Sequence, residues 1–188
     1  MRAVSRRLFV SVGTDHHRFD RLAGWVVDFA AAHPDWRGAL QHGRTPAPAG
    51  PANLDAFAFC DHGRLQELFA GSDAVVSHGG PATITEARRT GHVPVVVPRD
   101  PQHGEHVAGH QMLFAARLAA AGLVTVVRSA AELDAAVLAA AVRRDGVTAV
   151  EQAAAAAVVP PGVHRVGAVA EEVAALARAR RPSRARRR

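Results

Sequence analysis

Short apolar runs alternate with amphipathic stretches along this sequence. Each apolar run is rich in β-branched residues and ends at a glycine or a polar residue, as a buried strand does. The stretch after it repeats apolar residues at spacings of three and four, as a helix does. The pattern predicts strands over residues 7–13, 36–41, 54–60, 74–77, 93–97 and 123–127, and helices over residues 19–30, 65–70, 81–90, 103–121, 130–143 and 164–180.

The alternation of strand and helix decides the fold class. Strands that are apolar on both faces and separated by helices form a parallel sheet that is covered on both sides. We therefore expect a doubly wound, Rossmann-like α/β domain over residues 1–160. Two prolines and a glycine at 160–162 stop the alternation, so we expect a separate helix over 163–180, followed by a basic, disordered tail at 181–188.

The composition is that of an ordinary soluble globular domain. The 188 residues are 48% hydrophobic and can bury a core without disulfides or a structural metal. The single cysteine, Cys60, cannot form an internal disulfide or a cysteine zinc site, and we expect an inert thiol in a reducing compartment. No apolar run reaches the roughly 18 residues of a membrane-spanning helix, and the run from Leu8 to Val12 is too short for a secretion signal. These features predict a cytoplasmic protein.

The formal net charge of +6 is concentrated at the end of the sequence. Seven arginines lie within the last eleven residues, and without them the net charge would be −1. The folded body is thus close to neutral and has no aromatic platform or recognition helix, so we expect no specific nucleic-acid partner. Salt-sensitive association of the tail with nucleic acid is the weakest of the alternatives. The same arginines would contact anionic lipid headgroups if the protein lies at the inner face of a membrane.

Loops at the carboxyl ends of parallel strands are where ligands bind in such folds. In the loop after residues 74–77, Gly79 and Gly80 let a ligand approach the backbone, and Pro81 suits the first position of a helix. The helix amides that follow carry partial positive charge and would form an anion cradle. The turn lacks the lysine of a P-loop and the spacing of a dinucleotide-binding glycine motif. A tight turn without a ligand explains the glycines equally well.

Two other features adjoin this turn. Glu86 shares a helix face with Ala82 and Thr83, where its carboxylate would accept hydrogen bonds from a ribose diol. A solvated glutamate that favours the helix dipole is the alternative. His16 and His17 follow the first strand and either contact phosphate or form an exposed loop pair.

Three motifs follow one another in the sequence, FVSVGTDHHRFDRL at 9–22, SDAVVSHGGPATITEA at 72–87 and GHVPVVVPRDPQHGEHVAGHQ at 91–111. Together they resemble the C-terminal nucleotide-sugar domain of family 28 glycosyltransferases. The similarity is greatest to the small subunit of two-chain enzymes, such as the N-acetylglucosaminyltransferase of dolichol-linked glycan synthesis and its bacterial exopolysaccharide homologues. Ordered motifs over residues 7–127 are far more specific than one glycine turn.

The resemblance implies the C-terminal, donor-binding lobe of a two-lobed, GT-B type glycosyltransferase. Such an enzyme would transfer a hexose or N-acetylhexosamine from a UDP-sugar, with inversion, to a lipid-linked or polysaccharide acceptor, and would need no cofactor. A separate, membrane-associated chain would bind the acceptor and supply the general base. The resemblance assigns the donor diphosphate to Gly13, Thr14, His78, Gly79, Gly80, Pro81, Ala82 and Thr83. It assigns ribose to Glu86, uracil to Phe59, and the sugar to Gln102, His103, His110 and Gln111.

One departure from the small-subunit pattern concerns the sugar. Related subunits carry an acidic or amide residue shortly before the His-Gln pair, where this sequence has Ala108 and Gly109. A non-enzymatic nucleotide-sugar-binding or regulatory module is therefore a second hypothesis. A metal site is a further alternative, because His103, His106 and His110 lie close to one face of the long helix predicted there. That spacing permits a site without requiring one, and we expect no metal.

The last predicted helix has an apolar stripe. Prolines separate this helix from the alternating units, so we predict that it docks on the acceptor-binding chain. Packing within this chain is the alternative. The stripe consists of Val166, Val169, Ala170, Val173, Leu176 and Ala177.

Overall fold

The computed structural model describes residues 5–105, 110–145 and 163–179, so the predicted proline break and arginine tail lie outside the described residues. Within these ranges strands and helices alternate as predicted, and no helix is long and apolar enough to cross a membrane. The elements are β1 Arg6–Ser11, α1 Asp20–Ala32, β2 Trp36–Gln41, β3 Leu54–Phe57, α2 His62–Gly71, β4 Ala74–Ser77, α3 Pro81–Arg89, β5 Val95–Val96, the 3-10 turn η1 Pro101–His103, α4 His110–Ala120, β6 Thr125–Val126, α5 Ala130–Asp145 and α7 Val163–Ala179.

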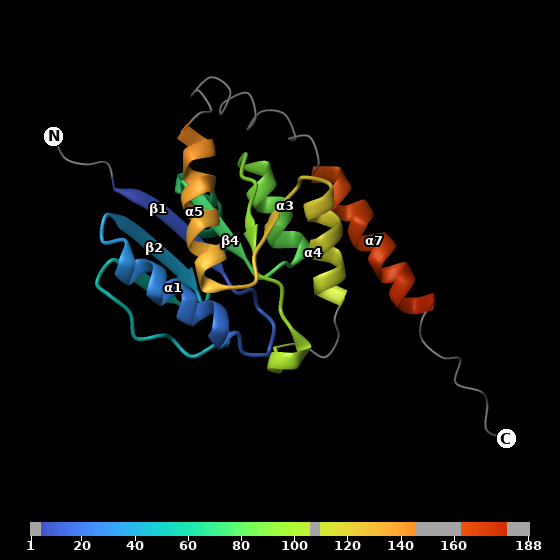
Figure 1. The fold of residues 1–188 in the computed structure, drawn as a ribbon, viewed down its shortest axis with the longest axis horizontal. Helices are drawn as coiled ribbons and strands as arrows, with labels where there is room; N and C mark the ends of the chain where they lie inside the picture. The colour runs from blue at the N-terminus through green and yellow to red at the C-terminus, as the bar shows by residue number, and fades with distance from the viewer. Residues whose placement is uncertain (1–4, 106–109, 146–162, 180–188) are drawn as a thin grey trace.

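Six parallel strands form one sheet in the order β3-β2-β1-β4-β5-β6. The chain moves outward in one direction from β1 and in the other direction from β4, so the strand order reverses between these two central strands (Figure 1). Doubly wound folds bind ligands in the crevice at such a reversal, beyond the carboxyl ends of the strands. The structure confirms the predicted fold class and places the loops after β1 and β4 next to each other.

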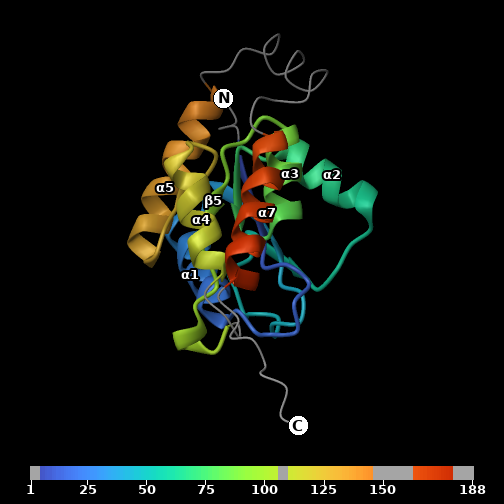
Figure 2. The same ribbon diagram turned by 90° about the vertical axis from the view of Figure 1, so that its right-hand side faces the viewer.

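Helices cover both faces of the sheet. On one face α1 and α5 lie side by side, and α2, α3 and α4 lie on the other (Figure 1 and Figure 2). The side chains of β1 alternate accordingly: Leu8 and Val10 pack under α1 and α5, while Phe9 meets Phe69 of α2 edge-on, with ring centroids 5.0 Å apart. Both faces are buried, which is why the strands read as nearly continuous apolar runs.

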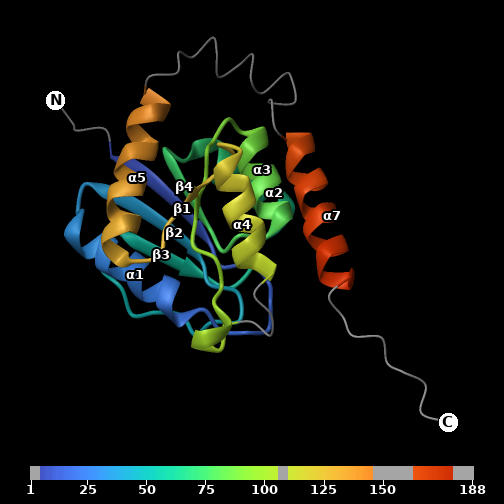
Figure 3. The same ribbon diagram turned by 45° about the vertical axis from the view of Figure 1, so that its right-hand side comes forward.

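The last helix packs on its own chain. It lies against α3 and α4 (Figure 3), and Val166 and Val173 are buried there together with Ile84. Arg117 of α4 also forms an ion pair with Glu172 of α7. The structure therefore favours packing within this chain over the predicted docking on a partner, because α3 and α4 already cover two valines of the stripe.

Val166→Ala is expected to lower the free energy of unfolding by about 2 kcal/mol, because it leaves a cavity between α7 and its neighbours. Leu176→Ala is the matched control on the same helix. It removes a larger side chain, but from a position 36% exposed, so its cost is expected to stay below about 1 kcal/mol. Urea unfolding followed by circular dichroism measures both values. A cost for Val166→Ala no greater than that of Leu176→Ala would contradict the burial of Val166 against α3 and α4.

Most other differences from the predicted elements lie at their ends. β3, β5 and β6 are shorter than the strands predicted over 54–60, 93–97 and 123–127. α2 begins earlier than predicted, because the Asp61 carboxylate accepts a hydrogen bond from the Arg64 N–H at 2.8 Å and caps the helix.

The prediction of one long helix after β5 is wrong at its beginning. Residues 101–103 form the 3-10 turn η1, Gly104 follows with a φ of +68°, and α4 begins only at His110. A glycine in the left-handed conformation ends a helical turn. His103 therefore does not share a helix with His110, which removes the single helix face considered for a metal. His106 lies outside the described residues.

Candidate functional site

Two turns of the same construction end the central strands, and we call them the glycine turns (residues 11–14 and 77–80). Gly13 and Gly79 have φ values of +81° and +92°, a left-handed conformation that favours glycine. Each donates its N–H to a serine hydroxyl two residues earlier, Gly13 to Ser11 Oγ at 3.3 Å and Gly79 to Ser77 Oγ at 3.1 Å. Ser11 and Ser77 are paired in the sheet, so the two turns lie beside each other at the strand-order reversal.

The His78 side chain fills the space between the glycine turns. A Cβ on Gly13 would lie 2.5 Å from its Cε1 atom, and a Cβ on Gly80 would lie 2.4 Å from its Nε2 atom. Both positions therefore require glycine as long as the ring stays in place. The ring Nδ1 lies 3.4 Å from the carbonyl oxygen of Ser11, which helps to orient it.

The half-buried His78 ring carries no charge at neutral pH. Burial and, to a smaller extent, the positive charge of Arg99 lower the pKa of His78 to about 4. An anion beside the glycine turns would therefore meet the His78 ring as a neutral group, and helix dipoles and backbone N–H groups would have to favour its charge.

The first turn of α3 leaves backbone amides without helical partners. Gly80 at the N-cap has no side chain with which to satisfy them, and Pro81 has no N–H. The first hydrogen bond of the helix runs from the Ile84 N–H to the Gly80 carbonyl at 3.1 Å. Helix geometry thus leaves the N–H groups of Ala82 and Thr83 open to an anion, at the end of the helix where the dipole favours negative charge. The structure thus has the turn and helix start expected here, and anion binding by these amides stays a prediction.

A buried ionic network in the loop after β5 was not predicted. Glu105, 3% exposed, accepts hydrogen bonds from Arg21 Nε and Nη2 at 2.9 and 2.8 Å and from the Asp100 N–H at 2.9 Å. Arg99 lies beside it and donates to carbonyl groups of the loop after β1. Charged residues in a loop are normally expected to be exposed. The only sign in the sequence that these residues belong to a binding site is their place at the carboxyl end of a strand.

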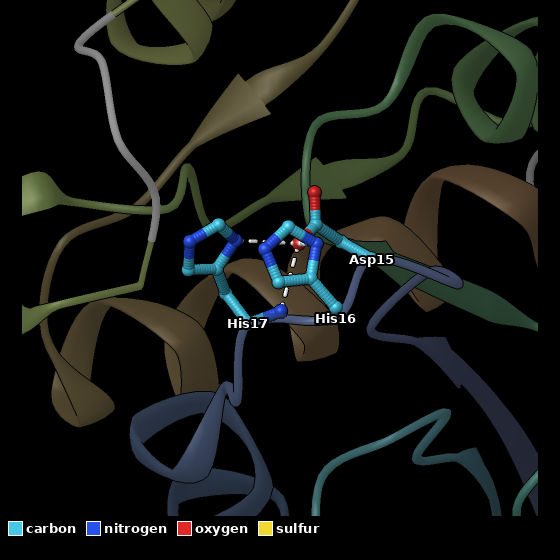
Figure 4. Close-up of side chains that lie close together, drawn as sticks. All are labelled: Asp15, His16 and His17. Atoms are coloured by element: carbon cyan, nitrogen blue, oxygen red, sulfur yellow. Dashed lines mark hydrogen bonds and ion pairs between the residues drawn. The ribbon is translucent and has the colours of Figure 1, made fainter.

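Asp15, His16 and His17 form the one group found in the described ranges whose ligand atoms, within 4.8 Å of one another, could hold a metal ion (Figure 4). Hydrogen bonds already account for this arrangement. Asp15 Oδ1 accepts from the His17 N–H at 2.8 Å and from the His17 ring Nδ1 at 2.7 Å. Burial opposes ionisation of Asp15, but these bonds and the charge of Arg99 outweigh it and lower the pKa of Asp15 to about 2. The cluster is explained as a turn that needs no ion.

The residues assigned to the nucleoside lie on either side of the start of α2. Phe59 follows β3, three residues before α2, and is 52% exposed. Glu86 lies on the side of α3 that faces α2, where its Oε2 accepts from Gln66 Nε2 at 2.7 Å and its Oε1 from Arg89 Nη1 at 2.9 Å. The Glu86 carboxylate is thus directed toward α2, and Gln66 and Arg89 fix its orientation.

The residues assigned to the sugar are not on one element. Gln102 and His103 are exposed on η1, and His103 lines a pocket of about 370 Å³ together with Glu105. Gln111, in the first turn of α4, has a buried Oε1 atom that accepts no hydrogen bond in the part of the chain described here. A sugar hydroxyl would satisfy such an acceptor. His110 begins α4, and its side chain lies outside the described residues.

Residues 40–161, well over half of the sequence, match the glycosyltransferase family 28 C-terminal domain. The chain belongs to this family. The matched region of the family 28 domain includes the glycine turn after β4, α3 and the loop after β5, while the turn after β1 precedes it. No curated protein is significantly similar to the chain in sequence.

Solved glycosyltransferase structures share the fold of this family 28 domain. The glycotransferase of kitacinnamycin matches with a TM-score of 0.61 at 20% identity, over 95% of this chain and 44% of that one. The calicheamicin glycosyltransferase CalG4 matches with a TM-score of 0.59 at 23% identity, over 94% and 45%. The glycosyltransferase VinC, solved in complex with DTDP, matches with a TM-score of 0.54 at 19% identity, over 90% and 42%. The chain has the fold of the C-terminal lobe of GT-B glycosyltransferases and spans less than half the length of these proteins.

Proposed function

We propose that this family 28 domain is the donor-binding unit of an inverting glycosyltransferase that transfers a hexose or N-acetylhexosamine from a UDP-sugar. The observation that carries the proposal is the pair of glycine turns, which meet at the strand-order reversal beside the open N-terminus of α3. Family membership and the shared GT-B fold support it. The nucleoside diphosphate in the VinC complex supports the ligand class.

In the proposed reaction an acceptor hydroxyl attacks the anomeric carbon of the UDP-sugar, and the bond from that carbon to the diphosphate breaks. The charge that develops on the departing UDP would lie against the N–H groups of Ala82 and Thr83 and the glycine turn at Gly13. Preorganised donors of this kind typically contribute roughly 3 to 4 kcal/mol each to the stability of a transition state. The proton of the acceptor hydroxyl goes to a general base outside this domain.

We place that base, and the site for a lipid-linked or polysaccharide acceptor, on a separate membrane-associated chain. The support is the resemblance to two-chain enzymes and the fact that this chain spans less than half of the solved glycosyltransferases. The proposed location is the cytoplasmic side of the membrane, where arginines of the tail would contact anionic headgroups. The proposal includes no cofactor, no metal and no specific nucleic acid.

Calorimetric titration of the purified chain with UDP, UDP-N-acetylglucosamine and UDP-glucose tests the donor site. We expect saturable binding of UDP and of at least one UDP-sugar, with no binding of ADP at the same concentrations. Lack of binding to all three uridine nucleotides would refute the proposed function. Tighter binding of one of the two UDP-sugars would identify the sugar.

A non-enzymatic nucleotide-sugar-binding module remains the second candidate, because Ala108 and Gly109 stand where related subunits carry polar side chains. Co-expression with an acceptor-binding chain encoded next to it separates the two functions. Transfer of radiolabelled sugar by the pair, and not by either chain alone, supports the enzyme. A stable pair that binds UDP-sugar without transferring it supports the module.

Glu86→Ala is expected to weaken UDP binding by about 1.5 to 3 kcal/mol, because a charge-assisted hydrogen bond to the ribose diol is lost. Its partners Gln66 and Arg89 are partly exposed, so thermal stability should change little. Glu67→Ala is the matched control, since it removes an exposed carboxylate of α2 that pairs with Arg64. Calorimetry with UDP measures both variants. Unchanged affinity in Glu86→Ala would remove Glu86 from the ribose site.

A further inference from the structure

Arg99 is buried although it follows a strand at the edge where ligands bind. It is 1% exposed, and its guanidinium donates to four backbone carbonyl groups. Nη2 donates to Val12 at 2.9 Å, and Nη1 donates to His17, Arg18 and Glu105 at 2.8, 3.2 and 3.2 Å. One side chain of the loop after β5 therefore binds the loop after β1 at several points.

These contacts anchor the loop after β1 at both of its ends. Val12 is the last residue before Gly13, and His17 and Arg18 close the loop before α1 begins. Residues 13–16, which include Gly13 and Thr14 of the first glycine turn, thus lie between two fixed points. A loop that is ordered before a ligand arrives does not lose conformational entropy when the ligand binds.

The buried charge of Arg99 is compensated in part, since Nε of its guanidinium is buried without a hydrogen-bond partner among the described residues. The guanidinium carbon lies 4.7 Å from the centroid of the Phe19 ring, a cation–π contact. Burial lowers the pKa of Arg99, and the carboxylates of Asp15 and Glu105 offset part of this effect. Glu105 is itself held by Arg21 on α1. The network therefore joins the loops after β1 and β5 to the first turn of α1.

We infer that Arg99 is a positioning residue, which holds the loop after β1 in the shape that receives the nucleoside diphosphate. The inference rests on the proposed function for the identity of the ligand. Lysine cannot replace arginine here, because one ammonium nitrogen does not reach carbonyl groups at both ends of the loop, whereas the planar guanidinium does. The charge of Arg99 also acts on His78, so the same residue influences the second glycine turn.

Arg99→Lys tests the inference, with Arg144→Lys as the matched control. Arg144 of α5 is half-buried and, like Arg99, donates to backbone carbonyl groups, those of Thr90 at 3.0 Å and Ala70 at 3.2 Å. Those residues lie at the ends of α3 and α2, away from the glycine turns. Both variants should lose thermal stability. Only Arg99→Lys should weaken UDP binding, by about tenfold or more, while Arg144→Lys should stay within about twofold of the parent protein.

Hydrogen–deuterium exchange gives a second measurement that needs no ligand. Backbone amides of residues 13–18 should exchange faster in Arg99→Lys and unchanged in Arg144→Lys. If Arg99→Lys does not fold, Arg99→Gln takes its place, because its uncharged amide can still donate to one of these carbonyl groups. If the parent chain itself does not bind UDP, the proposed function fails, and the exchange measurement still decides the role of Arg99. A folded Arg99 variant that binds UDP as the parent does, or whose loop exchanges as in the parent, overturns the inference.

Discussion

Gly80→Val is expected to weaken UDP binding about 100-fold or more, which corresponds to about 2.7 kcal/mol. A Cβ at this position would lie 2.4 Å from Nε2 and 2.8 Å from Cε1 of His78, so the ring must leave the space between the glycine turns. The displaced ring and the valine would then cover the backbone that the diphosphate approaches. The φ of Gly80 is −70°, which valine also adopts, so the effect comes from steric contact and not from backbone strain.

Calorimetry with UDP measures this loss, and circular dichroism verifies the fold. Gly24→Ala is the control, because a Cβ on Gly24 of α1 meets no atom within 4 Å. The stability of the double variant His78→Ala/Gly80→Val tests whether the clash with the His78 ring is the cause. Overpacking costs about 1 to 3 kcal/mol of stability, and removal of the ring should recover it. A folded Gly80→Val protein with the parent's UDP affinity would exclude the glycine turn from the donor site.

Acidification from about pH 7 to about pH 4 is expected to remove several kcal/mol of stability. Burial lowers the pKa of both His78 and His92 to about 4, and the charges of Arg99 and Arg144 add to the effect. In the unfolded chain these rings titrate near 6.5, so between these values the unfolded state binds more protons than the folded state. Stability is therefore complete above about pH 6.5 and falls by up to about 3 kcal/mol per histidine as the pH approaches 4.

Urea unfolding at about pH 7.5 and about pH 4.5 measures this difference. His92→Gln is the informative variant, because the buried His92 ring hydrogen-bonds the Phe69 carbonyl through Nε2 at 2.8 Å, and a glutamine can donate to the same oxygen without titrating. The loss on acidification should be about half as large in this variant. An equal free energy of unfolding at both pH values in the parent protein would contradict the buried, neutral state of the two histidines.

The parts of the site that are local in sequence can be predicted from it. Strand, glycine turn and helix follow one another directly from residue 74 to residue 90, so the positive-φ glycine, the proline at the helix start and the open amides are visible in the pattern. The cap of α5 is equally local, because Ser129 Oγ accepts from the N–H of Glu132, three residues later, at 3.2 Å. The neighbouring positions of β1 and β4 come from the structure, because alternation of strands and helices is compatible with more than one strand order.

Features that join distant parts of the chain could not be predicted. An arginine after a strand is normally exposed, and Arg99 is buried only because carbonyl groups from two loops converge on it. The cover over α7 likewise depends on how α3 and α4 are arranged. The prediction of where α4 begins is wrong for a local reason. The spacing of His103 and His110 is typical of a helix, so the sequence pattern predicts one continuous helix through Gly104. In the structure the φ of +68° at Gly104 ends the turn instead.

The pairing of β1 with β4 has a mechanical consequence. These strands join the first half of the sheet, β1 to β3, to the second half, β4 to β6, through four paired residues, from Leu8 with Ala74 to Ser11 with Ser77. A nucleotide held by both glycine turns would span this seam and act as a removable cross-link between the two halves. A ligand that binds only the folded chain raises its stability by an amount that grows with the ratio of ligand concentration to Kd. If the domain binds its donor as proposed, the two halves of the sheet would be held together less firmly when nucleotide sugar is scarce.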